Sequence, residues 1–244
     1  MDAAEGRAQV TARMHQHLKV LHELRGPQVD AALIQARRRL KAWQAARLAR
    51  THAELLKHPR WAPAARFFLD DLYGAHDLHQ RDEDVGRVVP KMERLLPRQA
   101  LQTLERALHM DALSEALDAD LADRLMQRGL LSKPDDLDET AYAQAYRESV
   151  RDPARMADRI EQVDLVEHIG QSLDHLTRLP MLATSLKLMK KPAELAGLAA
   201  LHAFLHRGFT AFAHMKGADE FIQRIVQGER AQMQCWCAQT ARSD

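Results

Sequence analysis

Apolar residues recur every three or four positions along most of the chain, which is the spacing of helices that bury one face. Prolines, glycines and acidic cap residues divide this pattern into separate lengths. The predicted helices cover residues 5–24, 30–57, 63–73, 82–96, 97–127, 138–150, 153–179, 180–189, 192–215 and 218–234. We therefore predict an all-α fold, a multi-helix bundle of about nine to ten helices with no sheet.

The composition supports this fold class. Val, Ile and Thr together account for 23 of 244 residues, and helix formers such as Ala, Leu, Arg, Gln and Glu take their place. The loops are short and no repeat is visible, so we predict a single domain over 1–244. Within it, an N-terminal helical hairpin over 1–58 could pack on a bundle formed by 61–234.

The most apolar stretch is Ala193–Ala213, which we predict to be the central helix of the bundle. His202, His206 and Arg207 interrupt it, and it is too short and polar to span a membrane. Seven residues are expected to be buried in it: Leu195, Leu198, Leu201, Phe204, Leu205, Phe209 and Phe212.

The N-terminal segment and the two cysteines both favour a cytoplasmic protein without membrane contact. The first eighteen residues contain acids and no apolar core of a secretory signal. Cys235 and Cys237 are one residue apart, which is a poor geometry for a disulfide, so we expect ordinary thiols in a reducing compartment.

The net charge is balanced, but its distribution is uneven. Lys and Arg number 35 against 34 for Asp and Glu, so the whole chain has no general attraction for polyanions. Six basic residues crowd the second helix: Arg37, Arg38, Arg39, Lys41, Arg47 and Arg50. Residues 82–123 are rich in acids. We favour a solvated basic face, or one paired with the acidic helices, over a nucleic-acid contact.

The segment Arg66-Phe67-Phe68-Leu69-Asp70-Asp71-Leu72-Tyr73-Gly74 gives the first candidate polar site. Asp70 lies one helical turn after Arg66, and Asp71 lies at the edge of an apolar face. A carboxylate beside aromatic rings needs a donor or shifts its pKa. Asp71 is therefore either a metal ligand or proton-transfer group, or a buried cap. Its expected partners are Arg66 and the loop after Gly74.

A second candidate is the acidic stripe formed by Asp111, Glu115 and Asp118, which are spaced i, i+4 and i+7. Glu115 projects onto an apolar face, so we predict that it is buried and needs a partner. The partner expected from the sequence is a histidine of the 153–179 or the 193–214 helix.

The chain has 13 histidines, and some of them could bind a metal. Asp164, His168 and His175 share one helix flank, while His202 and His206 are spaced i, i+4. The full set of candidate metal ligands is Asp71, Glu115, Asp164, His168, His175, His202 and His206. Such a set could hold iron or manganese pairs, or haem. Histidines that bond neighbouring polar groups are the alternative, and Glu-x-x-His, typical of di-metal bundles, is not found near Glu105.

The sequence resembles an uncharacterised family of bacterial, cytoplasmic, all-helical proteins. The resemblance rests on the segments FFLDDLYG, RDEDVGRVVPKMERLLP, ALHMDALSEALD and PAELAGLAALHAFLHRGFTAFAHMKGADEFIQRIVQGER, and it spans about residues 60–230. It implies an all-helical fold and no particular activity.

Motif searches leave the function open. The chain contains no P-loop, no dinucleotide-binding glycine motif and no nucleophile elbow. Our leading hypothesis is a binding or regulatory protein without a cofactor, whose polar stripes bind a protein partner or a small ligand. A homodimer is among the partners considered. The alternative is a metal-dependent enzyme with the architecture of haem-oxygenase-like or ferritin-like oxidases.

Overall fold

The computed structural model describes residues 3–72, 84–89, 97–133 and 137–238. Residues 84–89 are helical, and the other helical elements are α1 (Ala3–Arg25), α2 (Ala31–Thr51), α3 (Ala53–Lys57), α4 (Ala62–Phe67), the π-helical turn η1 (Phe68–Leu72), α6 (Arg98–Gln127), α7 (Glu139–Ser149), α8 (Pro153–Thr177), α9 (Pro180–Leu188), α10 (Lys190–Leu195), α11 (Ala199–Met215) and α12 (Asp219–Ala238). These described ranges contain no strand, so the all-α prediction is confirmed.

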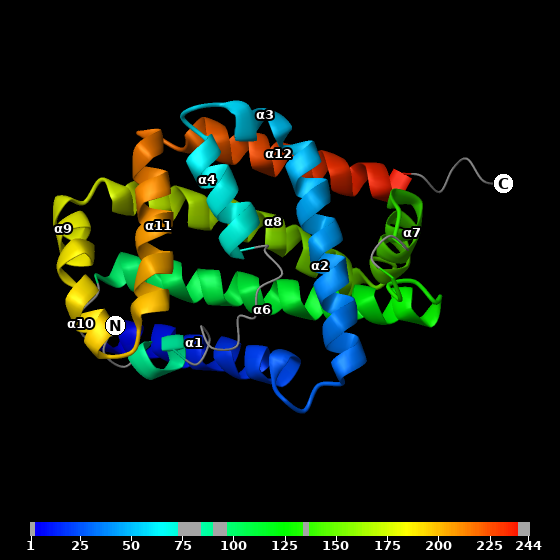
Figure 1. The fold of residues 1–244 in the computed structure, drawn as a ribbon, viewed down its shortest axis with the longest axis horizontal. Helices are drawn as coiled ribbons and strands as arrows, with labels where there is room; N and C mark the ends of the chain where they lie inside the picture. The colour runs from blue at the N-terminus through cyan, green and yellow to red at the C-terminus, as the bar shows by residue number, and fades with distance from the viewer. Residues whose placement is uncertain (1–2, 73–83, 90–96, 134–136, 239–244) are drawn as a thin grey trace.

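The helices form two crossed layers (Figure 1). In one layer α1, α6, α8 and α12 lie side by side in that order, and each contacts the next. In the other layer α2, α4 and α11 run across them, with α2 packed on α6 and α11 packed on α8 and α4. Both α1 and α2 therefore pack on α6.

Local sequence signals explain where several helices begin. The side chains of Asp30, Asp138 and Asp152 accept hydrogen bonds from backbone N–H groups in the first turns of α2, α7 and α8. Pro153 occupies the first position of α8, where its missing N–H costs nothing. These starts agree with the sequence predictions to within about one residue.

Three predicted helices are divided in the structure. The expected 30–57 helix breaks at His52, whose ring bonds Glu229 and packs against Gly228 of α12. The 63–73 helix changes from α to π geometry at Phe68. The 192–215 helix is interrupted by Gly197, whose φ of +71° is a conformation that suits glycine. Most of the predicted 82–96 helix lies outside the described residues.

The prediction of a central helix over Ala193–Ala213 is wrong. Leu195 is 91% exposed, and Leu198, Phe204, Leu205 and Phe209 are half-buried. Leu201 and Phe212 are buried as expected. The error arises because α9 and α10 lie at one end of the bundle, where apolar side chains such as Met181 and Leu188 stay exposed. The central position belongs instead to α6, which contacts α1, α2, α7 and α8.

Buried apolar residues gather in three clusters. One joins α3, α4, α8, α11 and α12 around Phe212 and Phe221, and a second joins α2, α6, α7 and α12 around Tyr142 and Trp236. The third lies between α1, residues 84–89, α6 and α11. Among the described helices, none is both long enough and apolar enough to cross a membrane.

Candidate functional site

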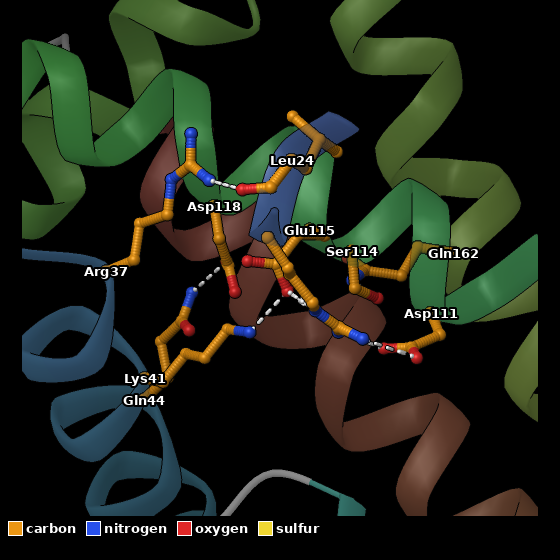
Figure 2. Close-up of polar contacts among 10 residues, drawn as sticks. Leu24, Arg37, Lys41, Gln44, Asp111, Ser114, Glu115, Asp118 and Gln162 are labelled. Carbon is orange, nitrogen blue, oxygen red and sulfur yellow. Dashed lines mark hydrogen bonds and ion pairs between the residues drawn. The ribbon is translucent and has the colours of Figure 1, made fainter. Parts of the chain in front are cut away.

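The acidic stripe of α6 faces the basic residues of α1 and α2. Arg25 at the end of α1 donates from Nε to Glu115 Oε2 at 2.9 Å and from Nη2 to Asp111 Oδ1 at 2.6 Å. Lys41 of α2 reaches the same oxygen of Glu115 from the other side (Figure 2). One buried carboxylate of α6 therefore bonds two helices, α1 and α2, through residues that lie 90 and 74 positions earlier in the sequence.

The two cations keep Glu115 ionised inside the protein. Burial by itself raises the pKa of a carboxyl group, but Lys41 and Arg25 outweigh this and hold the pKa of Glu115 below its usual value. The predicted burial of Glu115 is confirmed, since the residue is 3% exposed. The expected histidine partner is wrong, because the arginine and lysine side chains that reach Glu115 come from the N-terminal helices.

The basic face of α2 is largely used inside the molecule. Arg37 donates to the carbonyl of Leu24 at 2.6 Å, and Arg39 donates to the carbonyl of Leu131. Nη1 of Arg47 donates to both carboxylate oxygens of Glu229 of α12, at 2.9 and 2.8 Å. The interpretation that this helix pairs with the acidic helices is confirmed for Lys41, which bonds Glu115, whereas Arg47 bonds an acid outside the acid-rich stretch.

Asp118, one helical turn beyond Glu115, has a different environment. Its Oδ1 accepts a hydrogen bond of 2.9 Å from Gln44, and the residue is 6% exposed (Figure 2). Burial raises the pKa of Asp118, and the attraction of Lys41 and Arg159 offsets this shift only in part. The same stripe thus holds one carboxyl whose pKa is lowered and one whose pKa is raised.

This contrast predicts that Asp118→Asn will increase stability above neutral pH. A group whose folded pKa is raised supports the fold at low pH, and this support is lost as the pH rises through the folded pKa. Asn keeps an acceptor for Gln44 and cannot ionise. We expect a higher melting temperature than wild type at pH 8, with the difference shrinking at acidic pH. A lower melting temperature at pH 8 would contradict this account.

Beside Asp118 lies a small cavity of about 60 Å³, between α2, α6, α7, α8 and α12. Its size suffices for a few water molecules or a small molecule. Charged and amide groups on its wall include Gln44, Arg47, Asp118, Arg159, Gln162 and Glu229. Apolar and aromatic groups on its wall include Leu48, Val163, Met233, Tyr142, Tyr146 and Trp236.

Several polar atoms of residues that line the cavity are buried without a hydrogen-bond partner in the described structure. They are Nε and Nη2 of Arg159, the hydroxyl of Tyr146 and Nε of Arg47. Arg159 is 5% exposed, and its Nη1 donates to Gln162 at 3.3 Å. Buried donors are almost always paired with protein, water or ligand, so such a group marks a place where another molecule is needed.

The aromatic wall holds these groups in position. Tyr142 stacks on Trp43 with ring centroids 4.3 Å apart, and Trp236 packs against both Tyr142 and Tyr146. The indole N–H of Trp236 donates to Glu139 at 2.8 Å. The Arg159 guanidinium lies over the Tyr146 ring at 5.2 Å, a favourable cation–π distance.

Sequence reasoning missed this cavity. It did not single out Arg159, Glu229 or Trp236. One signal was present in Tyr142 and Tyr146 themselves, because two tyrosines one turn apart place two hydroxyls on one buried face. The acidic stripe predicted from the sequence does include one residue of the cavity, because Asp118 lines it.

The FFLDDLYG segment lies elsewhere. Asp71 is paired with Arg207 of α11 and is partly buried, with 20% of its side chain exposed. Its expected partner Arg66 is exposed, as is Asp70. Tyr73 and the loop after Gly74 lie outside the described residues. Asp71 therefore forms an ion pair near the surface, in place of the predicted buried cap.

The candidate metal ligands do not converge. Asp164 pairs with Arg230, and the ring of His168 bonds the carbonyl of Asp164. His168 and His175 are exposed. The ring of His202 bonds the Leu186 carbonyl at 2.8 Å, and His206 stacks on His202. Over the described residues, no group of three or more His, Cys, Asp or Glu side chains could hold a metal ion.

Comparison with known proteins gives a family and no characterised relative. A search of curated proteins and a search of solved structures both return no match. A family profile matches residues 23–243, which include the acidic stripe and every residue of the cavity wall. The chain therefore belongs to the family described as Domain of unknown function (DUF8198).

Proposed function

We propose that this protein is a binding protein whose small ligand occupies the cavity beside Asp118. The observation that carries the proposal is the set of buried, unpartnered donors in residues that line the cavity, led by Nε and Nη2 of Arg159. A small, mostly preformed pocket with a few convergent polar groups is the usual form of a ligand site.

The neighbouring ion-pair network supports this assignment by contrast. Arg25 and Lys41 meet the carboxylates of Asp111 and Glu115, and their charges are compensated within the protein. Arg159 has no hydrogen-bonded carboxylate among the described residues. Unlike the ion pairs of α6, which hold helices together, the cavity groups have hydrogen-bonding capacity left for a molecule that is not part of the chain.

The experiment is a titration of the full-length protein observed by NMR through its indole N–H groups. The probes are acetate, acetamide, methylammonium and phenol, which represent an acid, a neutral amide, a cation and an aromatic alcohol. A ligand in the cavity is expected to shift the signal of Trp236, which lines it. Trp61 belongs to another core cluster and serves as the internal control.

Substitutions Trp236→Phe and Trp61→Phe assign the two signals. Saturable shifts of the Trp236 signal, with the Trp61 signal unchanged, would support the proposal. If all four probes leave the Trp236 signal unmoved, or move both signals equally, the cavity is not a ligand site and the proposal is overturned.

A further inference from the structure

The two unpartnered nitrogens of Arg159 form one edge of its guanidinium. Nε and Nη2 direct parallel N–H bonds to the same side of the plane, and this edge matches the two oxygens of a carboxylate. The opposite end of the group is held in place, because Nη1 donates to Gln162, which itself donates to Ser114 at 2.7 Å. The free edge is therefore fixed in orientation as well as buried.

The charges around the cavity leave room for one negative charge. Arg47 and Glu229 compensate each other through an ion pair in which Nη1 of Arg47 donates to both carboxylate oxygens. Asp118 accepts its hydrogen bond from Gln44 and makes none with Arg159. Burial also disfavours the ionised form of Asp118. Among the described residues no carboxylate is hydrogen-bonded to Arg159, so its positive charge is compensated only at longer range, which is costly inside a protein.

The rest of the wall limits the size and polarity of the ligand. A cavity of about 60 Å³ admits few non-hydrogen atoms. The lining residues Val163, Met233 and Trp236 offer contact to an apolar group and carry no charge. The carboxylate of Glu229 also lines the cavity and would repel a dianion such as phosphate more strongly than a monoanion at neutral pH.

We propose that the ligand is a small monocarboxylate, held by a two-pronged hydrogen bond from Nε and Nη2 of Arg159, with the Tyr146 hydroxyl as an additional donor. This inference rests on the proposed function and names the chemical class of its ligand. A short apolar tail on the carboxylate would face Val163, Met233 and Trp236.

The test measures affinities of acetate, propionate, acetamide and inorganic phosphate for the full-length protein, using the Trp236 signal and calorimetry. Acetate and acetamide have nearly the same shape and differ in charge. We expect acetate and propionate to bind at a single site, and acetamide and phosphate to bind at least about tenfold more weakly, the equivalent of one charged hydrogen bond.

Two variants locate the contact. Arg159→Lys keeps the charge and removes the planar edge, so acetate should bind about tenfold more weakly. Tyr146→Phe keeps the ring and removes only the hydroxyl, so acetate should bind about fivefold more weakly. The exposed Arg66→Lys is the matched control and should bind acetate like wild type.

The outcomes separate this inference from the proposed function. If acetamide, methylammonium or phenol binds in the cavity as tightly as acetate, the ligand site stands and the carboxylate assignment fails. If phosphate binds more tightly than acetate, or Arg159→Lys folds and binds acetate unchanged, the assignment also fails. If Arg159→Lys does not fold, the acetate–acetamide comparison and Tyr146→Phe decide. If no probe binds, both proposals fail.

Discussion

Glu115→Gln should destabilise the protein by about 3–5 kcal/mol, the range for breaking a buried ion pair by removing one partner. The substitution preserves shape and removes the negative charge that Arg25 and Lys41 share. The side chain of Glu115 is almost fully buried, so water cannot replace the lost interaction. Chemical denaturation of wild type and variant at neutral pH measures the difference.

The same residue predicts how stability depends on pH. Because the folded pKa of Glu115 is lowered, its contribution is present above the unfolded pKa and is lost as the pH falls through the folded pKa. The gap between wild type and Glu115→Gln should therefore narrow in acid. Glu54→Gln is the matched control, since its pair with Lys57 is exposed and worth little. Equal stability losses for the two variants would contradict the network described for α6.

Phe212→Ala should cost about 3–5 kcal/mol, the range for a buried phenylalanine. Phe212 is fully buried in the cluster that joins α3, α4, α8, α11 and α12, and its ring meets Phe68 and Phe221. Truncation would leave a void among elements that include the π-helical turn. Thermal and denaturant unfolding, monitored by circular dichroism, would measure the loss.

Leu195→Ala is the informative companion, because both residues belong to the stretch predicted as one central helix. Leu195 lies exposed at the end of α10, so its truncation should change stability by less than about 0.5 kcal/mol. A loss of stability at Leu195 similar to that at Phe212 would show that the Leu195 side chain is buried. It would also contradict the separation of α10 and α11 at Gly197.

The sequence predicts those features of this fold that depend on neighbouring residues. The all-α class, the caps at Asp30, Asp138 and Asp152, and the burial of Glu115 follow from local signals and helical spacing. The position of a helix in the bundle does not follow. Ala193–Ala213 and α6 both contain apolar stripes, and only the tertiary contacts of each reveal which one is central.

The partners in the candidate site could not be predicted for a related reason. Arg25, Lys41 and Arg47 bond acids that lie between 74 and 182 residues away along the chain. A spacing pattern shows which side chains share a face of one helix, but it carries no information on the helix opposite. In the sequence, Arg159 is indistinguishable from a surface arginine of an amphipathic helix. Only its position beside residues of α2, α6 and α12 shows that it is buried.

The order of helices in the layer formed by α1, α6, α8 and α12 has a consequence for folding kinetics. All-helical proteins usually fold fast because most of their contacts are local in the sequence. Here α1 pairs with a helix whose contacting residues lie about 90 positions away, and α12 is tied to α2 by Arg47 and Glu229 across 182 positions. The chain must close long loops before these pairs form, so we expect its folding to be slower than that of an up-and-down bundle of the same length.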